Sequence, residues 1–468
     1  MKIAAVDASE TITHVLDRLG FGPAPGDRQQ LEQEGVESYI QRQLAGGTEE
    51  PAVLADRLKG LSTLALSPVA LFDRYAAPPR PTPEQRQNEN LRRVQVLEEV
   101  ERSRLLRALA SPNQLQEVMV DFWFNHFNVF VGKRFTMLWV GAYEQEAIRP
   151  HALGKFRDLL GATAKHPAMS FYLDNWRNTD PASAAAKGQF KGLNENYARE
   201  LLELHALGVD GGYTQADVES LTRILTGWSV VSHQQQSADG SGFVFARERH
   251  DSQDKVLLGE AITGGGVEEG EAALDLLAQH PATARHISYK LAQHFVADTP
   301  PEALVNQLAE RFTSTDGDIA AVLQTLFASD AFWQPSYYQQ KFKTPYHYVL
   351  SLARARGWGQ ANVLPSDQSL KRLKGFLNQL GMPLYRCRTP DGYPQGQTTW
   401  LNAEAMLQRV SLAVTIVNID RDNRPTPDAL KETLGTQFWP AETWRIIESV
   451  PAGQQAALLL GSPEMMYR

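Results

Sequence analysis

Three carboxylates and an arginine share one face of the helix predicted for residues 194–207, NENYARELLELHAL. At about 100° per residue, Glu195, Arg199 and Glu203 follow one another along this face, and Glu200 lies beside them. Carboxylates gathered in this way can act as general acids and bases. The same spacing also suits ion pairs on a solvated helix surface, each worth roughly 0.2–0.5 kcal/mol. Both interpretations stay open at this point.

A second polar stripe runs along the helix predicted for residues 114–130, QLQEVMVDFWFNHFNVF. Its members recur at spacings of four, four and three, and they are Glu117, Asp121, Asn125 and Asn128. The other positions are mostly aromatic or aliphatic, which is typical of a buried helix. Buried carboxylates without partners would cost several kcal/mol, so the stripe must meet cations, water, a metal or donors from another helix. We expect this helix to pack antiparallel to or across helix 194–207, with Asp121 close to Arg199.

Two histidines lie near these stripes. His205 falls on the apolar side of the first helix, and His126 falls on the aromatic side of the second, at the edge of its polar stripe. We expect both to pack in the core, because a buried neutral imidazole needs only a backbone carbonyl or a similar partner. A ligand or acid–base role is the alternative for each.

The segment 233–266, HQQQSADGSGFVFARERHDSQDKVLLGEAITGGG, interrupts the helical pattern. Its short β-like runs predict a flap or hairpin with His250 near the turn. One interpretation is an ordinary surface loop. The other is a lid that brings His250 to Glu200 or Glu203, where a carboxylate would raise the pKa of the imidazole and make it an acid partner.

Spacing excludes several well-known sites. The chain has no H-E-x-x-H, G-x-x-x-x-G-K-[ST] or G-x-S-x-G motif and no strand-linked G-x-G-x-x-G. A di-iron E-x-x-H pattern is absent too, because no glutamate stands three residues before His126 or His205. The single cysteine, Cys387, lies between Arg386 and Arg388, which could depress its pKa, but no histidine stands beside it to make a catalytic pair.

Three functional hypotheses follow. The first is acid–base hydrolysis or elimination on a polymeric substrate, glycans included, in a cleft with aromatic walls. The second is a metal-dependent enzyme in which oxygen-rich ligation favours a hard divalent cation over zinc. The third is a non-catalytic helical scaffold for an exported partner protein, with the stripes as internal ion pairs. The candidate catalytic residues are Asp121, His126, Arg199, Glu200, Glu203 and His250.

The composition limits the choice of partner and compartment. The 468 residues can bury a large core, and the content of 43% hydrophobic and 21% charged residues is typical of a globular protein. The net charge of -8 argues against nucleic-acid or anionic-membrane partners. No segment approaches the roughly 18 apolar residues of a membrane helix, and the start MKIAAVDASETITHVL lacks the pattern of an export signal. We expect a cytoplasmic protein, or a periplasmic one if the chain is a processed form.

Helical periodicity dominates the elements that must position these residues. A long helix is predicted from residue 83 to 110, with Thr82 as its N-cap and Gln85 completing a capping box. Gly208 predicts a left-handed helix end, and Thr214 should cap the helix that follows. The fold class is therefore a mainly α multi-helical array or bundle with a short β-like hairpin insertion near 229–262. Its segments are 1–112, 113–228 with the candidate site, 229–267 as the flap, and 268–468, forming one continuous globular unit.

One known family resembles this chain over nearly its whole length. The similar segments include NENYARELLELHALGVDGGYTQADV, FWFNHF, YLDNW, HPATARHISYKLAQHFVAD, TDGDIAAVLQTLF and PLYRCRTPDGYP, and the family is the bacterial domain of unknown function 1800. The resemblance implies a mainly α-helical bacterial protein and no activity. Its relatives often carry export signals and are encoded near a second uncharacterised exported family. Phe124 stands where many relatives have a histidine, and His347 where a glutamate often stands; the first departure argues against a paired-histidine metal site.

Overall fold

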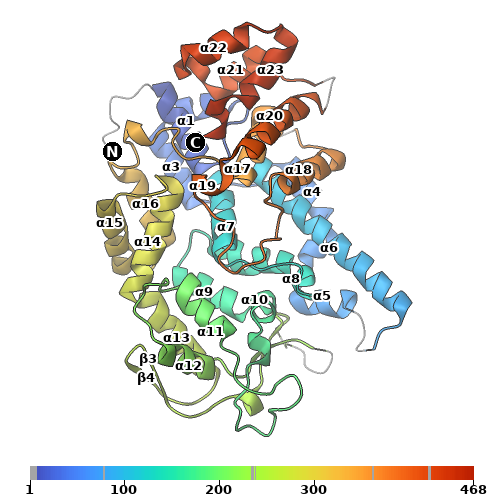
Figure 1. Cartoon of the computed structure of the whole chain (residues 1–468), viewed down its shortest axis with the longest axis vertical. Helices are drawn as coiled ribbons and strands as arrows, with labels where there is room; N and C mark the ends of the chain where they lie inside the picture. Colours follow the sequence, from blue (N-terminus) through green and yellow to red (C-terminus); the bar gives the residue numbers. More distant parts are fainter. Residues whose placement is uncertain (1–7, 77–79, 233–236, 238, 361–362, 420–422) are drawn as a thin grey trace.

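The computed structural model describes residues 8–76, 80–232, 237, 239–360, 363–419 and 423–468. Helices dominate the described chain, and short antiparallel strand pairs interrupt them, so the expected mainly α fold with short hairpins is confirmed. In Figure 1, α7 lies near the centre of the molecule, with α14 to α16 on one side and α6 on the other. The helices α20 to α23 form one end, and α12 and α13 lie near the opposite end.

The first part of the chain leads into the long helix α6. Its helices are α1 (Ala8–Leu19), α2 (Asp27–Glu34), α3 (Val36–Ala45), α4 (Ala52–Lys59), α5 (Pro68–Tyr75) and α6 (Pro83–Ala110). The capping box at the start of α6 is present, since Thr82 Oγ1 accepts from the Gln85 amide and Gln85 Oε1 accepts from the Thr82 amide. The local sequence signal therefore predicted where α6 begins.

The middle of the chain contains the two helices with polar stripes. Its elements are α7 (Gln114–His126), α8 (Thr136–Ala142), the π-helix η2 (Tyr143–Ile148), the 3-10 turn η3 (Arg149–His151), α9 (Phe156–Lys165), α10 (Pro167–Tyr172), α11 (Asn196–Glu200), the π-helix η5 (Leu201–His205) and α12 (Gln215–Ile224). The helix α7 is buried as predicted, and Trp123 Nε1 donates to the Ala152 carbonyl at 2.9 Å. The helix predicted for 194–207 changes into the wider π-helix η5 halfway along, which the sequence did not indicate.

Glycine ends this helical stretch at the expected place. Gly208 has a φ of 85°, the left-handed conformation that glycine adopts without strain. A side chain there would also lie 2.9 Å from His286 Nδ1, so Gly208 lets α14 approach closely. At the next helix, Thr214 accepts from the Asp217 amide and Asp217 accepts from the Thr214 amide. The predicted cap of α12 is thus confirmed.

Two short antiparallel strand pairs follow α12 in the described chain. The pairs are β1 (Trp228–Val230) with β2 (Phe243–Phe245), and β3 (Lys255–Leu257) with β4 (Glu260–Ile262). The hairpin expected near 229–262 is therefore present as these two pairs. Residues 233–236 and 238 of the flap lie outside the described residues.

The rest of the chain is helical again. Its helices are α13 (Val267–Gln279), α14 (Pro281–Phe295), α15 (Glu302–Ser314), α16 (Ile319–Ala328), α17 (Pro345–Ala355), α18 (Asp367–Gln379), α19 (Gln397–Trp400), α20 (Ala403–Asn418), α21 (Pro427–Leu434), α22 (Ala441–Glu448) and α23 (Ala452–Gly461). Among the helices of the described residues, none has both the length and the apolar character needed to span a membrane.

Candidate functional site

The first half of the α7 polar stripe belongs to a buried ion network. Arg149 donates from Nη1 to Glu117 Oε1 at 2.5 Å and from Nη2 to Glu117 Oε2 at 3.0 Å. Arg104, on α6, donates from Nη2 to Asp121 Oδ1 at 2.5 Å and from Nη1 to Glu144 Oε2 at 2.9 Å. All of these side chains are almost wholly buried, and each carboxylate has a guanidinium partner. We call these five residues the α7 network.

Aromatic rings close the α7 network. The Arg104 guanidinium carbon lies 5.0, 5.3 and 5.1 Å from the ring centroids of Phe124, Tyr346 and Tyr385. Burial raises the pKa of Asp121, and the charge of Arg104 opposes that rise. The cavity beside these groups measures about 20 Å³, room for about one water molecule. A substrate has no space beside Asp121, so this carboxylate is structural.

The expected approach of Asp121 to Arg199 is wrong. Arg199 is partly exposed and pairs along its own helical face, with Glu195 Oε2 at 3.1 Å and Glu203 Oε1 at 3.5 Å. The helix α7 packs instead against α3, α6 and η2, whereas α11 packs against α12. The prediction failed because the stripe required a cation but could not say which arginine would supply it. For Arg199 itself, the surface ion-pair interpretation holds.

The second half of the α7 stripe holds a loop in place. Asn128 Nδ2 donates to the carbonyls of Thr389 at 2.8 Å and Cys387 at 3.1 Å. Asn125 exchanges two hydrogen bonds with the backbone of Tyr393: its Nδ2 donates at 2.9 Å and its Oδ1 accepts at 2.7 Å. The two asparagines therefore fix the loop 387–393 against the C-terminal end of α7.

This loop presents Asp391 to solvent beside α7. The next residue, Gly392, has a φ of 75°, and a side chain on it would lie 2.2 Å from the Asn125 carbonyl oxygen. Only glycine suits such a close approach. Asp391 itself is exposed. The loop thus carries a carboxylate on a rigid support.

A lysine from α14 meets the end of α7. Lys290 Nζ donates to His126 Nδ1 at 2.8 Å, and His126 Nε2 lies 3.1 Å from the His205 carbonyl oxygen. Because a carbonyl only accepts, Nε2 carries the ring proton and Nδ1 offers its lone pair to the ammonium. Burial lowers the pKa of Lys290 to about 8, and the nearby Asp391 carboxylate opposes that lowering.

Three neutral imidazoles surround this ammonium. Burial, with smaller contributions from Lys290 and other imidazoles, lowers the pKa of His205 to about 3 and holds that of His126 well below its usual value. Burial and, to a smaller extent, the charge of Lys290 lower the pKa of His286 to about 4. The His205 and His286 ring centroids lie 6.2 and 6.1 Å from that of His126. At neutral pH the positive charge of this group is therefore on Lys290.

Glu200, from α11, joins the group through Asp391, whose carboxylate acts on both Glu200 and Lys290. Glu200 is half-buried, and its pKa is raised first by burial and then by the neighbouring Glu203 and Asp391 carboxylates. Glu200 thus binds its proton more tightly than an ordinary glutamate, whereas Lys290 holds its own less tightly than an ordinary lysine. We call Lys290, His126, Glu200 and Asp391 the Lys290 cluster.

A family model matches the chain over residues 14–467, nearly its whole length. The chain belongs to the DUF1800 family. That family is described as a protein of unknown function, so membership assigns no reaction. No curated protein and no solved structure matched the chain in the comparisons.

The Lys290 cluster contains residues of the DUF1800 segments quoted above. His126 comes from FWFNHF, Glu200 from NENYARELLELHAL, and Lys290 from HISYKLAQHF. Asp391 belongs to the turn TPDGYP. In the part of the chain that the structure describes, no group of three or more His, Cys, Asp or Glu side chains is arranged to hold a metal ion.

The lid interpretation, in which His250 would approach Glu200 or Glu203, is also wrong. His250 Nε2 lies 2.8 Å from Oε1 of Glu269, on α13, and Lys255 Nζ donates to Oε2 of the same carboxylate at 2.6 Å. All three side chains are buried. The flap folds onto α13, so its histidine serves a second ion network there, which we call the flap network (His250, Lys255 and Glu269).

The flap network resembles a nucleophilic triad in its distances alone. Thr226 Oγ1 lies 3.2 Å from His250 Nδ1, on the opposite side of the ring from Glu269. However, Thr226 is 0% exposed, and its hydroxyl donates to the Arg223 carbonyl. A hydroxyl without access to solvent cannot attack a substrate, so this arrangement is structural.

Cys387 was not expected to be a catalytic thiol, although Arg386 and Arg388 beside it could have lowered its pKa. Burial instead raises the pKa of the thiol. Both arginine side chains are exposed. The thiol is therefore a weak nucleophile at neutral pH.

The sequence hypotheses missed Lys290 and Asp391. A signal for the first existed, because His286, Lys290 and His294 recur at spacings of four and share one side of α14. Asp391 was not singled out as a site residue, since its partners come from other parts of the chain. Of the six candidates, His126 and Glu200 lie in the Lys290 cluster and Glu203 lies near it.

Proposed function

We propose that this protein is an acid–base enzyme, a hydrolase or lyase, whose centre is the Lys290 cluster. The observation that carries the proposal is the ammonium of Lys290, held 2.8 Å from Nδ1 of the neutral His126 ring, with the Asp391 carboxylate near both Lys290 and Glu200. Lys290 and Glu200 are partly exposed and Asp391 is exposed, so solutes can reach the group. Perturbed groups of opposite charge at an accessible position are typical of catalytic sites.

The pKa shifts of Lys290 and Glu200 suggest which of them acts as the acid and which as the base. At neutral pH, an amine with a pKa of about 8 is still mostly protonated and is a far better acid than an ordinary lysine. Glu200 is the matching base, because a raised pKa makes its carboxylate more basic. His126 fixes the ammonium, and Asp391 adds negative charge opposite it. In this assignment Lys290 protonates a leaving group while Glu200 removes a proton from water or substrate.

The proposal extends to a polymeric substrate, glycans included. The support is position: the Lys290 cluster lies at the surface, where an extended chain can approach it. The aromatic side chains of α7 pack on one another in the core, for example Phe122 on Trp123 at 4.8 Å, and so do not line this site. Recognition of a sugar face would have to come from partly buried tyrosines such as Tyr213.

A different observation favours a second candidate, the helical scaffold for an exported partner. Each of three carboxylates, Glu117, Asp121 and Glu144, is buried and paired with a guanidinium. A purely structural protein would have internal ion pairs of this kind. This observation concerns the α7 network only. The scaffold alternative predicts that the Lys290 cluster can be changed without loss of any activity.

The test is a substrate screen with matched variants of the full chain. Polysaccharides and peptidoglycan would be assayed for new reducing ends and for the ultraviolet absorbance of a new double bond. We expect Lys290→Met and Glu200→Gln each to lower the turnover found by about 100-fold or more. Lys59→Met and Glu195→Gln, which remove surface ion pairs, should keep it. Full activity in both cluster variants, or no turnover by the unmodified chain, would favour the scaffold.

A further inference from the structure

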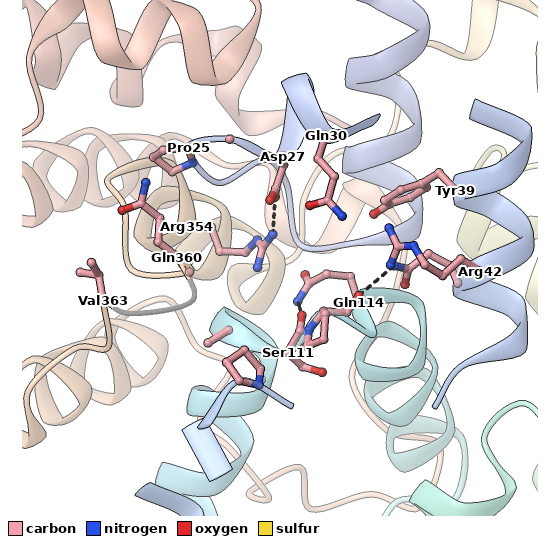
Figure 2. A pocket seen from close by; sticks show the side chains of 16 residues that line it. Pro25, Asp27, Gln30, Tyr39, Arg42, Ser111, Gln114, Arg354, Gln360 and Val363 are labelled. Atoms are coloured by element: carbon pink, nitrogen blue, oxygen red, sulfur yellow. Dashed lines mark hydrogen bonds and ion pairs between the residues drawn. The ribbon is translucent and has the colours of Figure 1, made fainter. Parts of the chain in front are cut away.

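A polar cavity lies at the other end of α7 from the Lys290 cluster. It measures about 470 Å³, within the range of small-molecule sites, and Figure 2 shows its walls. The cavity lies between α2, α3, the α6–α7 junction and the segment after α17. At 1.5 Å per residue, Gln114 at this end and His126 at the other are about 18 Å apart along the helix. The cavity is therefore separate from the proposed catalytic site.

Buried side chains hold the floor of the cavity in a fixed shape. Arg354 donates from Nε to the Gly22 carbonyl at 2.7 Å, from Nη2 to Asp27 Oδ2 at 2.7 Å, and from Nη1 to the Leu109 carbonyl. Gln43 Nε2 donates to the Pro112 carbonyl at 2.8 Å. These groups are already satisfied by the protein, so the cavity does not depend on a ligand for its shape.

The charges around the cavity cancel. Asp27 is paired with Arg354, as the dashed line in Figure 2 shows, and Arg42 is paired in a bidentate way with Glu34 at 2.8 and 2.9 Å. A ligand with a net charge would find no unmatched opposite charge among these four residues. The cavity is thus suited to a neutral ligand.

Several polar groups that line the cavity are left unused. Among the described residues, no hydrogen-bond partner is found for Asp27 Oδ1, the Tyr39 hydroxyl, Arg42 Nη1 or the side-chain amides of Gln30 and Gln360. They include an acceptor, a donor and groups that do both. A ligand hydroxyl also donates and accepts, so a molecule with several hydroxyls can satisfy this mixture.

The apolar part of the lining favours a ring over a fully polar chain. Pro25, Pro51 and Pro112 line the cavity and can pack against the C–H face of a sugar ring. We propose that this cavity binds a neutral, hydroxyl-rich small molecule, with a sugar ring favoured over an open-chain polyol. The proposal does not rest on the acid–base function and would stand if the Lys290 cluster proved inactive.

The test is binding to the intact protein by isothermal titration calorimetry and saturation-transfer NMR. The neutral probes are glucose, N-acetylglucosamine, maltose and sorbitol, and the charged probes are glucose 6-phosphate and glucuronate, all at millimolar concentration. We expect saturable binding of a neutral sugar, weaker binding of sorbitol, and none of the charged probes. Saturable binding of sorbitol alone would overturn the preference for a ring. Preferred binding of a charged probe, or no binding by any neutral probe, would overturn the proposal.

Variants show whether binding occurs at this cavity. Tyr39→Phe removes one hydroxyl that has no protein partner, so the fold should be retained, as circular dichroism can check. We expect it to weaken sugar binding by about two- to tenfold, the effect of one hydrogen bond. Gln30→Ala, at an exposed position, should weaken it to a similar degree. The matched control is Tyr289→Phe on α14. This tyrosine is exposed and does not line the cavity, so the variant should bind as the unmodified protein does. Unchanged affinity in both cavity variants would place any binding elsewhere and contradict the inference.

Discussion

Two polar groups that contact α7 differ in how completely their charges are paired and in their access to solvent. In the α7 network, every carboxylate meets a guanidinium, and aromatic rings exclude all but about one water molecule. In the Lys290 cluster, the Lys290 ammonium donates to a neutral imidazole, and the Asp391 carboxylate near it is exposed to solvent. Burial alone therefore does not distinguish the two groups; the completeness of pairing and the access to solvent do.

The largest expected effect breaks the α7 network. Arg104→Met would leave Asp121 and Glu144 buried without their main partner, so we expect a loss of about 3–5 kcal/mol in the free energy of unfolding. Denaturant unfolding measures it. The matched control is Arg102→Met, two residues away on α6, where the partner Asp367 is exposed and the loss should be about 0–1 kcal/mol. Equal losses in the two variants would mean that the network is no more than a surface ion pair.

The flap network is a second buried ion network, and it can be compared with the Lys290 cluster in the same way. Glu269→Gln would remove the carboxylate shared by His250 and Lys255, and we expect a loss of about 3 kcal/mol because the Lys255 ammonium stays buried. Thermal and denaturant unfolding would record it, while any activity of the folded protein should be unchanged. Loss of activity without loss of stability would instead give the flap a catalytic role.

A helix cap supplies a smaller, purely local effect. Thr214→Ala removes the side chain that accepts from the Asp217 amide at the start of α12, and we expect a loss of about 1 kcal/mol. The measurement is the midpoint of denaturant unfolding. Thr415→Ala on α20, where the threonine is exposed within a helix, is the control and should change stability less. A Thr214→Ala variant as stable as the unmodified chain would show that the cap contributes nothing.

These predictions also show which features could be predicted from the sequence. The capping boxes at Thr82 and Thr214 were predictable because each depends on residues three apart. The burial of α7 followed from its aromatic composition. The partner of Asp121 was not predictable, since Arg104 stands 17 residues earlier on another helix and nothing local distinguishes it from other arginines.

The candidate site was less predictable than the fold. Lys290 and His126 are 164 residues apart, so only the packing of α14 against the end of α7 brings them together. His250 was assigned to the wrong carboxylate for the same reason, because Glu269 belongs to a helix that begins after the flap. The π-helix η5 has no local signature either, and its sequence continues that of an ordinary helix.

The smallest expected loss of stability is at Lys290. Because the folded state lowers the pKa of this amine, burying its charge opposes folding at every pH below about 8. Lys290→Met should therefore be at least as stable as the unmodified chain at pH 7. Between pH about 8 and 10.5 the unfolded chain keeps the proton that the folded chain has lost, so the stability of the unmodified protein should rise toward that of the variant. Denaturant unfolding across this pH range measures the difference. A variant much less stable than the unmodified chain at pH 7 would make Lys290 a structural residue.

The pKa of Lys290 in the intact protein tests the central claim most directly. Lysine labelled with ¹³C at Cε can be followed by NMR as a function of pH, and Lys290→Arg assigns its signal. The assignment is needed because burial also lowers the pKa of Lys341 to about 8. The account predicts that the signal lost in Lys290→Arg titrates near pH 8 and shifts when Asp391 is changed to asparagine. A titration near 10.5, the ordinary value for lysine, would contradict the assignment of Lys290 as the acid of an active site.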